Sequence, residues 1–121
     1  MKGIGIDMCE VRRIERAMNE AFLMRYFTEE ERTYILARGK MGVQSAAAMF
    51  AAKEAFLKAT GVGIGGGIAL NEIGTVHQPG GAPVYVLVGA AQQKLEAMGA
   101  QQAFLSLTHE TGMAAAVCVI E

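Results

Sequence analysis

The sequence predicts an α+β fold in which a mostly antiparallel sheet packs against helices. Two observations favour this class. Helix-like patterns with capping residues dominate residues 9–60, whereas residues 70–121 consist mainly of short apolar segments separated by glycine turns. Such a run of helices followed by a run of strands is typical of α+β proteins. The expected order of elements is β-α-α-α-β-β-α-β-β, and the 121 residues suit one domain over residues 1–121.

The first predicted element is a short buried strand, KGIGIDM at residues 2–8, with isoleucines on one face and glycines on the other. Asp7 is expected to end this strand, and a helical pattern follows from about Cys9 to Ala21. Asp7 and Glu10 have the spacing of a capping box, so Asp7 is a candidate cap for that helix.

Two further helices are predicted before the first glycine-rich loop. TEEERTYILARG, residues 28–39, has Thr28 as its N-cap, acidic residues in its first turn and Gly39 as its end. The longest helix is expected to begin near Ser45, a candidate cap, and to end at Gly61. Strong helix formers dominate the residues between these two positions.

The second half is predicted as two hairpins and one helix. LNEIGTVHQ and APVYVLV flank a glycine turn, PGG, and form the first hairpin. GAAQQKLEAMGA is a helix that ends at Gly99. AFLSLTHE and GMAAAVCVIE form the closing hairpin around residues 110–112.

Composition narrows the function classes. The net charge of −1 argues against generic nucleic-acid binding, and the apolar runs are too short to span a membrane. The N-terminus lacks the features of a signal peptide, so Cys9 and Cys118 are expected to be reduced thiols in the cytoplasm. An apolar fraction of 52% in a short chain hints at self-association.

The positive charge is unevenly distributed. All six arginines lie in the first third of the chain: Arg12, Arg13, Arg16, Arg25, Arg32 and Arg38. The first three could meet an acidic partner, or they could form an ordinary solvated helix face with neighbouring glutamates.

Asp7 is the first candidate for chemistry. A carboxylate at the end of a strand, beside glycines that allow a ligand to come close, suits a hard cation. The alternative is that Asp7 merely caps the next helix.

A second candidate is the charged group in FAAKEAFLKATGVG, residues 50–63. Glu54 and Lys58 share one helix face, and Lys53 lies about 100° round the helix. They could be an ordinary surface ion pair. This helix is apolar nearly all round, however, and a buried carboxylate needs a partner or a metal. Glu54 and Lys58 could therefore hold a metal and a diphosphate, and Lys53 has no evident role.

The glycine loop and the histidines are weaker signals. Residues 61–66 match the G-x-G-x-x-G pattern, but the pattern follows a helix instead of a strand, which excludes a dinucleotide-binding fold. The loop could present amides to an anion or act as a flexible helix end. His109, at a strand end, could be structural or functional, and His77 is expected to be a surface residue.

Three segments occur together in a fixed order: GIGIDMCEVRRI, FAAKEAFLKATGVGI and LSLTHETGMAAAVCVIE. Together they closely resemble the holo-acyl-carrier-protein synthases, the small bacterial type of 4′-phosphopantetheinyl transferase, over essentially the whole chain. The resemblance implies the fold of that family. It also implies transfer of 4′-phosphopantetheine from coenzyme A to a serine hydroxyl of an apo acyl carrier protein, with release of adenosine 3′,5′-bisphosphate.

The resemblance assigns roles to the candidate residues. Asp7 and Glu54 match the family's Mg²⁺ ligands, and Lys58 matches the lysine that holds the diphosphate, so these three are the expected catalytic residues. Segments that line coenzyme A in the family correspond here to Gly61, Gly63, Gly81, Pro83 and His109.

The resemblance also implies partners and an assembly. In the family the first helix docks onto an acidic helix of the carrier protein, which points to Arg13 and Arg25 with Phe22 as an apolar anchor. The family is typically a homotrimer with active sites between subunits. This chain departs from the family at Met49, where many relatives carry arginine. If that arginine holds a phosphate in the family, Lys40 or a different geometry is expected to substitute here.

Two alternatives of other classes remain at this level. One is a non-catalytic module of the same fold that binds coenzyme A or a nucleotide, and the other is a structural trimer in which Glu54 and Lys58 form an ion pair. The joint presence of Asp7, Glu54 and Lys58 favours the enzyme, because neither alternative needs the complete set.

Overall fold

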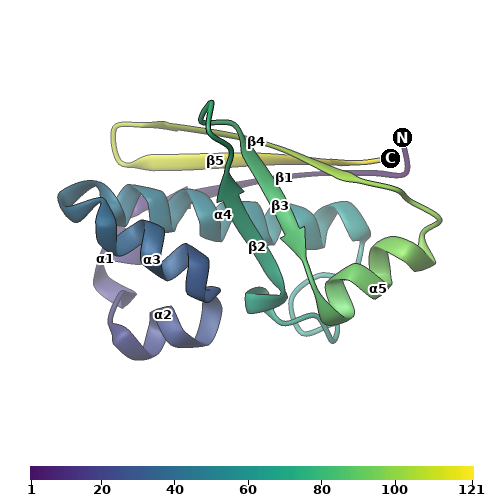
Figure 1. The fold of residues 1–121 in the computed structure, drawn as a ribbon, viewed down its shortest axis with the longest axis horizontal. Helices are drawn as coiled ribbons and strands as arrows, with labels where there is room; N and C mark the ends of the chain where they lie inside the picture. The colour runs from purple at the N-terminus through teal and green to yellow at the C-terminus, as the bar shows by residue number, and fades with distance from the viewer.

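A long central helix organises the fold of residues 1–121, which the computed structural model describes in full (Figure 1). This helix, α4 (Gly42–Thr60), lies against one face of a three-stranded antiparallel sheet. The strands of that sheet, in the spatial order β1-β5-β4, are β1 (Gly3–Glu10), β5 (Met113–Ile120) and β4 (Ala103–Glu110). The predicted α+β class with antiparallel strands is confirmed.

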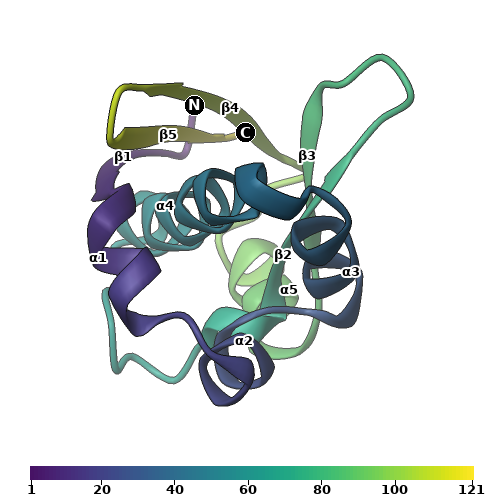
Figure 2. The same cartoon turned by 90° about the vertical axis from the view of Figure 1, so that its left-hand side faces the viewer.

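The other elements lie beside and below α4, and among them the β2–β3 hairpin rises along the β4 edge of the three-stranded sheet (Figure 2). They are the helices α1 (Val11–Ala17), α2 (Glu20–Tyr26), α3 (Glu29–Ala37) and α5 (Gly89–Ala97), and the hairpin of β2 (Ile73–His77) and β3 (Pro83–Leu87). Short 3₁₀ turns at Gly39–Met41 and Leu70–Glu72 complete the chain. No helix here is both long enough and apolar enough to cross a membrane.

Glycines on β1 allow this strand to lie directly on α4. A Cβ atom at Gly5 would collide with the carbonyl oxygen of Ala55, and one at Gly3 would meet the next turn of the helix in the same way. The small residues on both sides therefore bring the backbones of strand and helix together. The isoleucines between the glycines, Ile4 and Ile6, face away from α4 and are exposed. The expectation of a buried strand is thus correct only for its glycine face.

The N-terminal strand is longer than predicted, and the helix after it is divided. Every residue of β1 as far as Glu10 pairs with β5, so Asp7 lies inside the strand. The predicted capping box is wrong, because Glu10 precedes α1 without any side-chain capping bond. The helix predicted over residues 9–21 consists of α1 and part of α2, since Asn19 starts a new helix by accepting a hydrogen bond from the Phe22 amide. Four helices, not three, separate the first two strands.

The remaining predicted boundaries are close to those observed. Thr28 and Glu31 form a reciprocal capping box at the start of α3, and Gly61 ends α4 with a left-handed backbone at φ +76°. Both predicted hairpins and the helix that ends before Gly99 are present. Ser45 is not a cap: α4 begins at Gly42, and the Ser45 hydroxyl donates to the carbonyl oxygen of Met41 within the first turn.

The core is a single cluster of 23 buried apolar residues, and α4 contributes most of its alanines. Lys53 is also completely buried there. Its Nζ donates to Glu31 Oε1 at 2.6 Å and to the carbonyl oxygen of Ile73 at 2.6 Å. The other oxygen of Glu31 accepts from the Thr75 amide at 3.0 Å. Lys53, which had no role at the sequence level, therefore ties α3, α4 and β2 together.

Candidate active site

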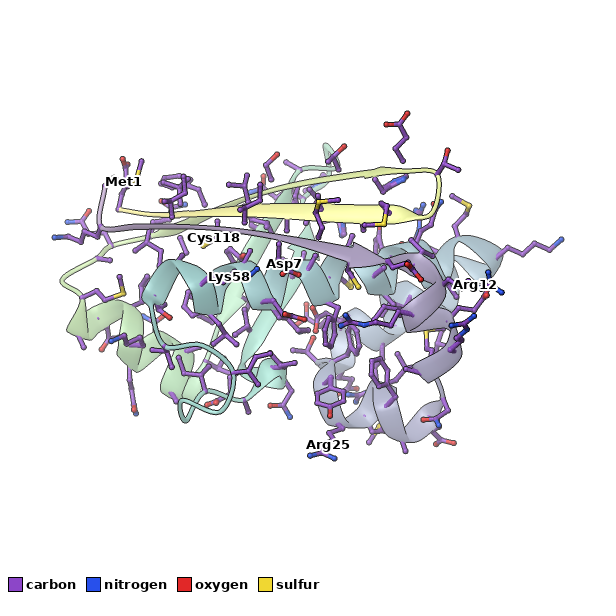
Figure 3. All side chains as sticks on the ribbon, turned by 180° about the vertical axis from the view of Figure 1, so that it is seen from behind. Met1, Asp7, Arg12, Arg25, Lys58 and Cys118 are labelled. Carbon is purple, nitrogen blue, oxygen red and sulfur yellow. The ribbon has the colours of Figure 1, made fainter.

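Asp7 and Lys58 meet between β1 and α4. Lys58 Nζ donates to Asp7 Oδ1 at 2.8 Å and to the carbonyl oxygen of Ile6 at 3.1 Å. The Asp7 side chain is largely covered, whereas the lysine side chain is about half exposed. Its hydrogen bond to Asp7, together with the charge of that carboxylate, raises the pKa of Lys58. Figure 3 shows both residues on the same side of the molecule, between the strand and the helix.

Glu54 lies one helical turn before Lys58 and faces the same strand. Its side chain is mostly buried, and Oε1 is 3.9 Å from the guanidinium of Arg13. Burial raises the pKa of Glu54, and the negative charge of Asp7 raises it further, whereas Arg13 and Lys58 act in the opposite direction. The two carboxylates are thus close enough to repel each other, and cations flank them.

This donor set fits a divalent cation. Two carboxylates on facing elements would have their mutual repulsion relieved by a bound metal ion. The structure contains no group of three or more histidine, cysteine or acidic side chains that could hold a metal ion. Mg²⁺ is commonly held by one or two carboxylates, with water and substrate phosphates as its other ligands.

The glycine loop begins at Gly61, directly after the end of α4 that carries Lys58. Gly61 and Gly63 both have positive φ, at +76° and +75°, and nothing lies within 4 Å of the place where a Cβ atom would be. The loop therefore leaves α4 with its backbone open, about one turn beyond Lys58.

A second set of predicted residues gathers in a cavity of about 210 Å³ on the other side of α4. Gly81, Pro83 and His109 all line it, together with Met49. Lys40 is exposed and does not line this cavity. The complete lining is Tyr34, Arg38, Gln44, Ser45, Ala48, Met49, His77, Gly81, Pro83, Leu107 and His109.

The two sets of residues point away from each other within one chain. Ser45 and Ala48, which line the cavity, lie about 120–180° round α4 from Glu54 at 3.6 residues per turn. Asp7 belongs to β1 and His109 to β4, and these strands lie on opposite sides of β5, about 10 Å apart. Figure 2 shows β1 and α1 on one side of α4, with α3 and the β2–β3 hairpin on the other. The chain thus carries a carboxylate half-site and a separate cavity half-site.

Stacked side chains form one wall of the cavity. The rings of Tyr34 and His77 are parallel, with centroids 4.3 Å apart, and the Arg38 guanidinium lies 5.5 Å from the Tyr34 ring centroid. Burial lowers the pKa of His77, and the positive charge of Arg38 lowers it further. Nδ1 of His77 and Oε1 of Gln44 are buried without a hydrogen-bond partner.

These wall residues were missed at the sequence level. His77 is not a simple surface residue, because it is half-buried against Tyr34. Tyr34 and Arg38 are four residues apart at the end of α3, which places them on one helix face. That spacing was the available signal, but only the hairpin of β2 and β3 brings His77 to the same place.

The residues expected to bind the carrier protein surround an aromatic cluster beside Glu54. The Phe22 ring lies 5.0 Å from that of Tyr26 and 6.1 Å from that of Phe50, so Phe22 is half-buried. Arg13 lies over the Phe50 ring and Arg25 over the Tyr26 ring. The structure brings the three predicted docking residues to one exposed surface that adjoins the carboxylate half-site.

Taken together, the fold and the half-sites define a small α+β protein with two carboxylates and a lysine at one point and a cavity with a single arginine at another. Residues 3–118 match the model of the 4′-phosphopantetheinyl transferase superfamily. The holo-[acyl-carrier-protein] synthase of Treponema denticola is 44% identical over 120 residues, which are 98% of this chain and 97% of that protein.

Solved structures agree with this match. The crystal structure of the synthase from Neisseria meningitidis superposes with a TM-score of 0.88 at 38% identity, covering 100% of this chain and 98% of that one. The Helicobacter pylori synthase in complex with coenzyme A gives a TM-score of 0.82 at 33% identity over 98% of this chain and 99% of that one. The chain belongs to the 4′-phosphopantetheinyl transferase superfamily, and it is an enzyme of that class.

Proposed function

We propose that the protein transfers 4′-phosphopantetheine from coenzyme A to a serine hydroxyl of an apo acyl carrier protein. The observation that carries this function is the meeting of Asp7, Glu54 and Lys58 between β1 and α4. The relatives that match over nearly their whole length are holo-[acyl-carrier-protein] synthases, and the H. pylori structure contains coenzyme A. The serine oxygen attacks the phosphorus that carries the pantetheine arm, and the bond from that phosphorus to the adenosine 5′-phosphate oxygen breaks. Adenosine 3′,5′-bisphosphate leaves, and the proton of the serine hydroxyl is released to solvent.

Lys58 is placed to bind the diphosphate of coenzyme A. Its Nζ is already ordered by Asp7 and is half exposed, so a phosphate oxygen can approach it from solvent. Its charge would offset the negative charge that develops on the leaving adenosine 3′,5′-bisphosphate. The open amides of the loop at Gly61 and Gly63 extend this surface toward the nucleotide.

Asp7 and Glu54 would hold Mg²⁺ and orient it toward the diphosphate. When bound, the metal supplies charge neutralisation at the attacked phosphoryl group. Burial and the charge of Asp7 raise the pKa of Glu54, and a bound cation would offset both effects and favour the ionised form that acts as a ligand. Arg13, Arg25 and Phe22 lie on the adjoining surface, where the acidic helix of the carrier would bring its serine to the metal side of the site.

We also propose that the enzyme is a homotrimer whose active sites lie between subunits. The two half-sites of one chain face in different directions, so a neighbouring copy is needed to bring a carboxylate half-site beside a cavity. The outer face of the three-stranded sheet offers an apolar surface for this contact. Ile4, Ile6, Met8 and Phe104 are all about half exposed or more on that face.

Two buried free thiols suit a reducing compartment such as the cytoplasm.

The transfer is tested by incubating the protein with coenzyme A, Mg²⁺ and several apo acyl carrier proteins, and then weighing the carriers by mass spectrometry. A gain of one phosphopantetheine arm is expected. If none of the carriers gains mass, the proposed function is wrong.

The metal assignment is tested separately with Asp7→Ala and Glu54→Ala. Both variants are expected to lose transfer, and their circular dichroism should remain that of the folded protein. Mg²⁺ binding, followed by calorimetry in the presence of coenzyme A, should weaken in both. Near-wild-type rates in either variant would remove that residue from the metal site.

A further inference from the structure

The cavity half-site has an unusual charge distribution. Arg38 is its only lysine or arginine, and none of its eleven lining residues is acidic. The guanidinium forms no salt bridge, and no hydrogen bond occupies its donors. A permanent cation with five free donors beside a cavity without carboxylates is suited to an anion.

We propose that Arg38 binds the 3′-phosphate of coenzyme A and so lets the enzyme distinguish coenzyme A from 3′-dephospho-coenzyme A. This inference rests on the proposed function, because it assumes that the nucleotide enters the cavity. The diphosphate is assigned to the carboxylate half-site with Lys58. The 3′-phosphate is then the one remaining charged group of coenzyme A that can reach the cavity.

The stack on the cavity wall holds Arg38 in place. Its guanidinium lies 5.5 Å from the centroid of the Tyr34 ring, and that ring in turn lies flat against His77. Stacking of this kind orients the planar group and limits the entropy lost when a phosphate binds. The same wall contains the imidazole of His77, whose buried Nδ1 has no hydrogen-bond partner.

The other candidate cations are less well placed. Met49 is 1% exposed and brings a thioether to the cavity at the position where relatives often have arginine. Lys40, the substitute suggested by the resemblance, lies outside the cavity lining, whereas Arg38, which is also exposed, belongs to it. Arg38 can supply the missing charge from the end of α3 instead of from α4.

The test compares two ligands and four single substitutions by calorimetry. Wild-type protein is titrated with coenzyme A and with 3′-dephospho-coenzyme A, and the ratio of the two Kd values measures recognition of the 3′-phosphate. Charge-assisted hydrogen bonds predict a preference for coenzyme A of about 10- to 100-fold. Arg38→Gln should reduce that preference to about 3-fold or less, while its affinity for the dephospho compound stays near that of wild type.

Two matched substitutions complete the experiment. Lys40→Gln removes the competing cation. Arg12→Gln makes the same change as Arg38→Gln, but at an exposed position on α1, which precedes all the cavity-lining residues in the sequence. Both are expected to keep the wild-type preference. Arg38→Lys retains the charge but not the planar fork, and should show an intermediate preference.

The outcomes separate the two claims. If Arg38→Gln keeps the full preference, or if Lys40→Gln loses it, the assignment of Arg38 is overturned while the transferase function stands. If wild-type protein binds coenzyme A without preference over the dephospho compound, the assignment also fails. If wild-type protein does not bind coenzyme A at all, the proposed function and this inference fail together.

Discussion

At the scale of single residues, the cavity wall contains a tyrosine ring that contacts both a histidine and an arginine. His77 contacts the Tyr34 ring, and Arg38 covers the same tyrosine. The positive charge of Arg38 disfavours a second positive charge on the imidazole, and burial acts in the same direction. At neutral pH the neutral imidazole is therefore favoured, and its unpartnered Nδ1 lies in the cavity wall.

Arg38→Gln should raise the pKa of His77. The substitution removes the charge that opposes protonation, but burial remains, so the pKa should rise only part of the way toward its ordinary value. Titration of the imidazole resonances of wild-type and variant protein by NMR measures the shift. An unchanged or lower pKa of His77 in the variant would show that Arg38 does not act on the imidazole.

At the scale of secondary-structure elements, the contact of β1 with α4 determines where Asp7 lies. The glycine at Gly5 allows the strand to touch the helix backbone at Ala55. Because Asp7 is two residues further along the same face of the strand, this contact sets its distance from Lys58.

Gly5→Ala should destabilise the protein and weaken transfer together. The added methyl group has no space against the Ala55 carbonyl, and overpacking of this kind costs about 1–3 kcal/mol. Gly80→Ala is the matched control, because a Cβ atom there meets nothing within 4 Å and the backbone has no positive φ. Denaturant unfolding and the mass-spectrometric assay measure both effects. Equal stability of the two variants would contradict the close contact of strand and helix.

The buried pair of Lys53 and Glu31 joins three elements. Lys53→Met should lower the free energy of unfolding by about 3–5 kcal/mol, because it leaves the Glu31 carboxylate buried without its cation. Lys40→Met makes the same change at an exposed position and should alter stability by no more than about 0.5 kcal/mol. Urea denaturation of both variants and of the wild-type protein measures these changes in the free energy of unfolding. A small effect at Lys53 would mean that the carboxylate reaches solvent when the lysine is removed.

At the scale of the whole molecule, the two half-sites make a prediction about assembly. Asp7→Ala disables the carboxylate half-site and should be inactive by itself. Arg38→Gln disables the cavity half-site and should be weakly active by itself at low coenzyme A concentration. If one active site combines halves from two subunits, a refolded equimolar mixture forms some complete sites. Random assembly predicts recovery of about a quarter of wild-type activity.

Two controls accompany this mixing experiment. Light scattering of the wild-type protein should give the mass of a trimer. Mixing Asp7→Ala with Glu54→Ala should recover no transfer activity, because both substitutions disable the same half-site. Recovery in this control, or no recovery in the first mixture, would contradict active sites shared between subunits.

The sequence by itself determined the class of fold, both hairpins and the charged residues that matter. Local signals are sufficient for these features: the capping box at Thr28, the left-handed Gly61 and the alternating pattern of the last two strands are all set by neighbouring residues. The candidates Asp7, Glu54 and Lys58 followed from spacing and from the resemblance, and the structure places them together.

Features that depend on distant residues were decided only by the tertiary structure. The end of β1 was misjudged because its last residues are held by β5, more than a hundred positions later. Lys53 gained its role from Glu31, and Arg38 its place in the cavity from the β2–β3 hairpin. The separation of the carboxylate and cavity half-sites by α4 was likewise not visible in any spacing. Local sequence patterns indicate which residues share one face of a helix or strand. Only the tertiary packing determines which other residues that face contacts.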